Sequence, residues 1–236
     1  MPPIQRSIAI VTTGNYASEV LTFDAPSVCK KGDRILLFIG GADIAGKQDP
    51  GPSTDEAWSE VLLVSGPNAG GTADMVALVC ERTFDPNEPG LMSIELVNGP
   101  AAITWCAIVY RGVQDIVSPT EVNVTNSTNW PCPSISFVEY SGVLVGVAAS
   151  DGTATNFTAP GAERFDSAGS SLVRLLVFDL APEAAGATGV KTATSAAAKY
   201  GACGSLGLVA SGLVGSKSLS GVSPVSGMLG LPTRGV

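Results

Sequence analysis

The sequence contains no histidine, and this absence excludes several kinds of active site. A Ser-His-Asp triad, a Cys-His pair and a histidine-ligated metal site all need imidazole, so this chain alone forms none of them. The five cysteines are widely spaced and include no Cys-x-x-Cys pair, so they do not suggest a zinc site. No pair of carboxylates stands out as a glycosidase site. We therefore expect a protein that is not an enzyme, needs no cofactor and keeps its cysteines as buried free thiols.

Charged residues are scarce and mostly acidic: they make up 14% of the chain, and the formal net charge is −8. Phosphate backbones attract lysine and arginine, so an acidic chain without basic clusters argues against a nucleic-acid partner. No stretch approaches the roughly 18 consecutive apolar residues of a transmembrane helix. The first residues lack the basic start and apolar core of a signal peptide. We therefore expect neither export nor a membrane partner.

What the chain does contain is a series of apolar, β-branched segments separated by turns rich in its 28 Gly and 16 Pro. Ala101–Val113 is apolar, β-branched and aromatic, which is typical of a strand buried on both faces. Arg34–Gly40 has the same character. No stretch combines the 3.6-residue periodicity and the caps of an amphipathic helix. The pattern predicts an all-β protein with an antiparallel β-sandwich.

The predicted strands fall into two halves with the same order of elements. The corresponding pairs are Arg34–Gly40 with Gly142–Ser150, Trp58–Ser65 with Ala162–Ser167, Asp74–Thr83 with Ser171–Leu180, Leu91–Val97 with Val190–Ala197, and Ala101–Val113 with Ala202–Val214. Two similar antiparallel halves suggest a jelly-roll-like sandwich. Chance similarity between generic strands is the alternative.

These pairs define the predicted domain organisation. The sandwich domain covers residues 1–214, with halves 1–116 and 134–214. Residues 117–133 are polar and end in Trp-Pro-Cys-Pro, so we expect an irregular crossover between the halves. Residues 215–236 form the C-terminal arm, which is too rich in Gly and Pro for a regular element of its own.

The C-terminal arm is also too apolar for an ordinary solvated tail. We expect it to extend over another protein chain, either a second copy or another component of an assembly. An arm folded back on its own sandwich is the alternative. The apolar residues expected to make these contacts are Val222, Val225, Met228, Leu229 and Leu231.

Two further groups are candidates for ligand binding. Trp130 lies in the predicted crossover, where its ring has the best chance of exposure as a platform for a sugar, whereas Trp58 and Trp105 are expected in the core. A long loop before Trp58 carries four acids that could bind Ca²⁺, although the spacing does not match an EF-hand and solvated loop acids are the alternative. These acids are Asp43, Asp49, Asp55 and Glu56.

A set of short motifs is spread along the chain, namely Gly32–Phe38, Trp58, Arg82, Val109–Val113, Ala159–Arg164 and Ala184–Gly189. In this order the motifs resemble those of sandwich domains of virion structural proteins from tailed bacteriophages. They are turns and strand ends, and they cover roughly residues 7–214. The resemblance implies a particle component located in the virion, whose partners are other copies of itself and other virion proteins.

Within that family the chain is expected to be a capsid decoration, cement or head-fibre subunit that assembles through protein–protein contacts. A tail or fibre module that binds a host-surface carbohydrate is the alternative. A glycan array distinguishes the two.

Overall fold

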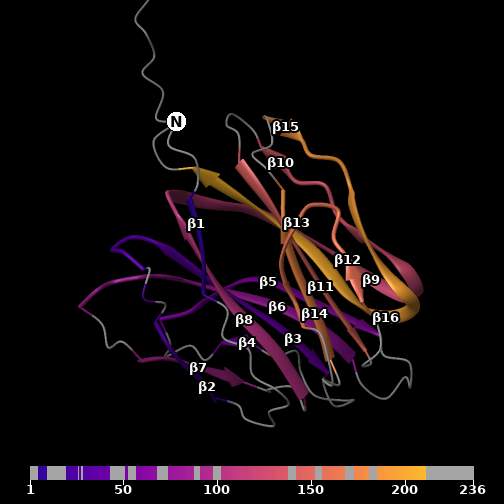
Figure 1. Cartoon of the computed structure of the whole chain (residues 1–236), viewed down its shortest axis with the longest axis horizontal. Coiled ribbons are helices and arrows are strands. Elements are labelled where there is room, and N and C mark those ends of the chain that lie inside the picture. The colour runs from indigo at the N-terminus through magenta and orange to yellow at the C-terminus, as the bar shows by residue number, and fades with distance from the viewer. Residues whose placement is uncertain are drawn as a thin grey trace, which may run out of the picture.

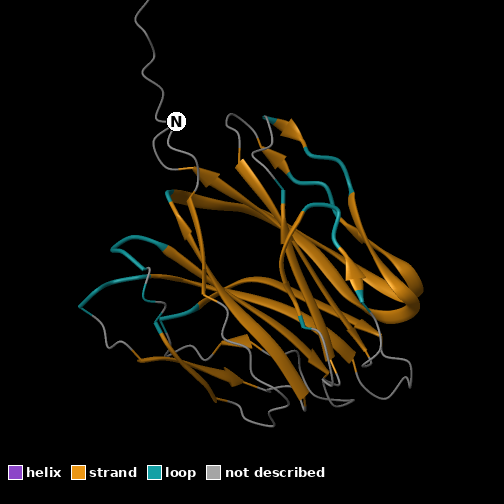
Figure 2. Ribbon diagram, in the orientation of Figure 1, coloured by secondary structure: helices purple, strands orange, loops and turns teal. Residues whose placement is uncertain are grey.

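The fold is described from a computed structural model. It describes residues 5–9, 20–25, 27, 29–42, 51–52, 57–67, 74–87, 91–97, 102–137, 142–151, 156–167, 173–180 and 185–210. These residues form 16 strands and no helix (Figure 2). The prediction of an all-β, antiparallel sandwich is confirmed, whereas the predicted C-terminal arm lies outside the described residues.

The strands divide evenly between the two parts of the chain. The first eight are β1 (Gln5–Ala9), β2 (Val20–Asp24), β3 (Arg34–Ala42), β4 (Gly51–Pro52), β5 (Ser59–Pro67), β6 (Asp74–Thr83), β7 (Leu91–Val97) and β8 (Ala102–Arg111). The last eight are β9 (Val113–Cys132), β10 (Ser136–Phe137), β11 (Gly142–Asp151), β12 (Phe157–Thr158), β13 (Ala162–Asp166), β14 (Val173–Asp179), β15 (Gly186–Ala187) and β16 (Lys191–Ala210).

Each half of the chain builds one main sheet. The first sheet has the order β1-β8-β3-β6-β5, and the second has the order β16-β11-β14-β13 with β9 paired to β16. All of these pairings are antiparallel. Figure 1 shows the two sheets stacked face to face, purple against orange. Each main sheet is thus drawn from one half of the sequence, and the finer jelly-roll assignment is not confirmed.

The strand pairing repeats from one half to the other. In the first half β3 lies between β8 and β6, and in the second half β11 lies between β16 and β14. The edge hairpins carry a matching irregularity: a register shift falls between Glu60 and Leu62 in β5 and between Glu163 and Phe165 in β13. A β-bulge at the same place in both hairpins supports the prediction of two similar halves.

The predicted crossover at 117–133 is wrong, because most of it is part of the strand β9. This strand is 20 residues long and pairs with β16 along most of its length. Its sequence alternates, with Val122 and Val124 turned toward the protein and Asn123 and Thr125 exposed to solvent. Such alternation is typical of a strand that covers a core with one face. β9 therefore opens the second half, in the positions that β1 and β2 hold in the first.

Three apolar layers hold the strands together. One lies between the two main sheets and includes Leu36, Phe38, Val145 and Leu206. A second lies between the first sheet and an outer layer of β2, β7 and β4. The third lies between the second sheet and an outer layer formed by the end of β9, the start of β16, and β12. Both faces of each main sheet are therefore buried, which explains the nearly continuous apolar segments in the sequence.

Two glycines lie where the main sheets pack against each other. A Cβ atom on Gly66 of β5 would overlap the carbonyl oxygen of Gly201 in β16. A Cβ atom on Gly40 of β3 would instead lie 3.2 Å from the nearest side-chain atom, on Val173. Backbone cannot move aside as a side chain can. Of these two glycines, Gly66 is therefore the one that requires the absence of a Cβ.

This difference gives a matched pair of variants. Gly66→Ala should lower the free energy of unfolding by about 1–3 kcal/mol, the range for overpacking a core. Gly40→Ala should stay within about 1 kcal/mol of the parent, because alanine also reduces the entropy of the unfolded chain. Urea denaturation of both variants measures the difference. An equal loss of unfolding free energy in the two variants would mean that the sheets do not meet at Gly66.

Candidate interaction sites

The three tryptophans all lie in the core, which corrects the expected exposure of Trp130. The indole of Trp130 is fully buried, and its Nε1–H donates a hydrogen bond to Ser195 Oγ at 2.9 Å. The ring of Phe157 packs edge-on against it at 5.3 Å. Trp130 is buried because it lies on the inward face of the regular strand β9, where the sequence suggested an irregular crossover. Trp58 and Trp105 are buried as predicted. No indole is therefore available as a sugar platform.

The other predicted site residues lie outside the described residues. This holds for the four loop acids, Asp43, Asp49, Asp55 and Glu56, and for the five apolar residues of the C-terminal arm. Within the described ranges, no group of three or more Cys, Asp or Glu side chains is placed to hold a metal ion.

The cysteine side chains are free thiols in largely buried positions. Cys80, Cys106, Cys132 and Cys203 are buried, and Cys29 is half-buried. Burial, with a contribution from Asp33, raises the pKa of Cys29 to about 11. A hydrogen bond to Cys203 and then burial raise the pKa of Cys132. Because the thiolate is the form that attacks and binds metals, protonated thiols of this kind act as apolar packing groups at neutral pH.

The best-formed ion pairs bind the ends of strands together. Arg111 donates two hydrogen bonds to Asp33, at 2.9 and 2.7 Å. Arg164 likewise donates two to Asp179, at 2.8 and 2.9 Å, and the carboxylate of Asp179 is fully buried between the sheets. The hydrogen bonding to Asp179 raises the pKa of the Arg164 guanidinium further. These arginines therefore have structural roles in the described fold.

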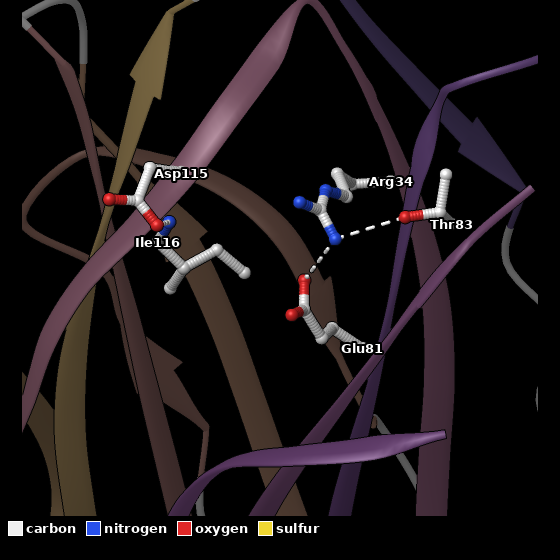
Figure 3. Close-up of polar contacts among 5 residues, drawn as sticks. All are labelled: Arg34, Glu81, Thr83, Asp115 and Ile116. Atoms are coloured by element: carbon white, nitrogen blue, oxygen red, sulfur yellow. Dashed lines mark hydrogen bonds and ion pairs between the residues drawn. The ribbon is translucent and has the colours of Figure 1, made fainter. Parts of the chain in front are cut away.

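A third arginine lies beside a shallow surface hollow of about 230 Å³. Arg34 Nη1 donates to Glu81 Oε2 at 3.1 Å and to Thr83 Oγ1 at 3.0 Å, both on β6 (Figure 3). The same view shows Asp115 on β9, which accepts a hydrogen bond from the backbone N–H of its neighbour Ile116 at 2.9 Å. The Arg34 group is part-exposed and satisfied by its own neighbours, so it offers no organised ligand site.

The larger hollow lies between the edges of the two main sheets. Its volume is about 410 Å³, and it is lined by Leu63 and Ser65 of β5 and by Glu121, Val122 and Asn123 of β9. We call it the β5/β9 groove. Its lining is mostly polar and includes a carboxylate, an amide and a hydroxyl group. The groove could not be predicted because the polar composition of residues 117–133 predicts an irregular crossover, although the alternation at Glu121–Thr125 indicates a strand.

The described fold is thus a two-sheet antiparallel sandwich formed from two similar halves. No family model, curated protein or solved structure matches the chain in comparisons of its sequence and fold. In the part of the chain that the structure describes, no helix has the length and apolar character needed to span a membrane.

Proposed function

We propose that the chain is a non-enzymatic structural subunit that assembles through contacts with other copies of itself. Its setting in this proposal is the particle of a tailed phage, as a capsid decoration, cement or head-fibre subunit. The phage setting rests on the resemblance of the turn and strand-end motifs. The structural role rests on how the described side chains are used.

The observation that carries the proposal is that side chains able to bind a ligand or take part in catalysis are used to hold the fold together. All three tryptophans are buried, and four of the five cysteines are buried as well. Arg111, Arg164 and Arg174 are each paired with an aspartate. A rigid sandwich whose aromatic and charged side chains are buried or paired with each other is what we expect of a structural subunit. The burial of Trp130 also favours this proposal over the glycan-binding alternative, because the alternative loses its aromatic platform.

The apolar C-terminal arm supplies the expected means of assembly. Each buried Leu, Val or Met side chain contributes on the order of 1.5–3 kcal/mol before ordering costs. We expect the full chain to form oligomers, and a chain truncated after Val214 to remain folded but monomeric. Sedimentation velocity over a range of concentrations measures the association, and circular dichroism with thermal melting checks the fold.

The possible outcomes distinguish between roles of the C-terminal arm in folding and in assembly. A truncated chain that unfolds places the arm in the core of its own sandwich. A truncated chain that assembles like the parent shows that the arm has no role in assembly. A full chain that stays monomeric at every concentration overturns self-assembly.

A further inference from the structure

The β5/β9 groove lies where two sheet edges run side by side. β5 ends the first sheet, and β9 is the edge strand of the second sheet beside β16. The two strands contact each other, yet among the described strands neither pairs with the other. A strand edge presents backbone N–H and C=O groups that can accept a further extended segment. The groove therefore lies between two edges that can both receive a strand.

The local packing explains why a groove forms there. Gly66 of β5 meets the backbone of Gly201 in β16, so the two sheets are in backbone contact at that point. On β9, the residues opposite this part of β16 are Asn123 and Val124. The side chains of Leu63 and Val122 pack into the apolar cores on the outer sides of the two sheets, and the exposed Glu121 and Asn123 line the groove between them. The groove is therefore mostly polar and carries one acidic side chain.

The C-terminal arm has the complementary chemistry. Residues 215–236 contain Lys217 and Arg234 and no acidic residue, although the chain as a whole carries a formal charge of −8. Their small residues allow close approach to a backbone edge, and their two cations complement the carboxylate of Glu121. Fully extended, a segment of this length reaches about 70 Å at ~3.3 Å per residue.

The direction of β16 favours a second copy as the receiver of the arm. β16 passes the level of the groove at Ala202–Gly204, opposite Glu121–Asn123, and ends at Ala210 opposite Val113. The chain therefore leaves the sheet while running away from its own groove, and it would have to reverse direction to enter that groove.

We propose that the β5/β9 groove binds residues 215–236 of a second copy of this chain, as an extended segment with its cations near Glu121. The inference deepens the proposed function, on which it rests, by naming the surface that receives the arm. Glu121 supplies the charge complementarity, and the edges of β5 and β9 supply the backbone partners.

A charge exchange in the full-length chain tests the contact. Glu121→Lys should weaken self-association by about fivefold at low salt, and Lys217→Glu with Arg234→Glu should weaken it similarly, since contacts between exposed charges are modest and screened by salt. Combining all three substitutions should restore association. Glu95→Lys is the matched control, because Glu95 is an exposed acid of β7, which belongs to the outer β2-β7-β4 sheet and does not line the groove. Sedimentation velocity gives the association constants.

Crosslinking between copies identifies the occupant independently of charge. One full-length variant carries Asn123→Cys and another carries Ser218→Cys, and the two are mixed and mildly oxidised. We expect a disulfide between copies that joins positions 123 and 218, identified by peptide mass spectrometry. A mixture with Glu95→Cys in place of Asn123→Cys should yield far less of the linked product.

Each remaining result overturns the inference. If the full chain assembles through its arm but the Glu121 and Glu95 variants behave alike and no link to position 123 forms, the groove is not the receptor and the proposed function stands. If the mixture gives no link but a single chain that carries both Asn123→Cys and Ser218→Cys forms one within itself, the arm binds its own groove. If the full chain never associates, the proposed function fails together with the inference.

Discussion

Replacing Trp105 with alanine should lower the free energy of unfolding by about 3–5 kcal/mol, the range for deleting a large buried aromatic side chain. Trp105 is 1% exposed, on the face of β8 that is covered by β2 and β7. Its ring lies 5.1 Å from that of Phe23, on β2. Removing the indole leaves a cavity between the first sheet and its outer layer, and the flanking strands cannot close it without breaking their pairing.

Two further variants make this prediction specific. The indole Nε1–H of Trp105 has no hydrogen-bond partner among the described residues. Trp105→Phe keeps a six-membered aromatic ring and removes the unpartnered N–H together with part of the indole, so it should cost clearly less than Trp105→Ala. Leu91→Ala should be nearly neutral, because Leu91 is 60% exposed. Urea denaturation measures all three variants. A loss near zero for Trp105→Ala would place β8 at the surface and contradict the described core.

The strands that could be predicted from the sequence are those with both faces buried. Arg34–Gly40 and Ala101–Val113 are apolar at nearly every position because each main sheet is covered on both sides, and they correspond to β3 and β8. The repeated order of elements was also visible, since each half must place such strands at the centre of its sheet. The structure adds that the two halves form separate sheets, which the order of elements alone does not specify.

The parts that could not be predicted depend on tertiary packing. The sequence predicts Val190–Ala197 and Ala202–Val214 as separate strands, whereas β16 runs from Lys191 to Ala210 and contributes first to an outer layer and then to a main sheet. Shifts in the register with β9 fall between Thr194 and Gly201, where β16 passes from one layer to the other. The burial of Trp130 and the β5/β9 groove could not be predicted because both depend on β9 being a regular strand.

The two halves also place a carboxylate that is paired with an arginine at matching positions, with different burial. Glu81 lies opposite Ser59 just before the bulge of β5, and Asp179 lies opposite Ala162 just before the bulge of β13. The pair of Arg34 with Glu81 has side chains 26% and 20% exposed, whereas in the pair of Arg164 with Asp179 they are 19% and 0% exposed. The carboxylates hold matching strand positions, whereas Arg34 comes from β3 and Arg164 from the bulge of β13. The comparison therefore contrasts a partly exposed carboxylate with a fully buried one.

Arg164→Ala should therefore cost about 3–5 kcal/mol of unfolding free energy, because it removes two charge-assisted hydrogen bonds from a carboxylate that water does not reach. Arg34→Ala should cost only about 0–1 kcal/mol, since water solvates Glu81 when the guanidinium is lost. Arg164→Lys should recover only part of the loss, because an ammonium group cannot make the same two-pronged contact. Urea denaturation at neutral pH gives the three values. Equal costs for the two alanine variants would show that Asp179 is solvated, and full rescue by lysine would show that charge alone stabilises this end of the sandwich.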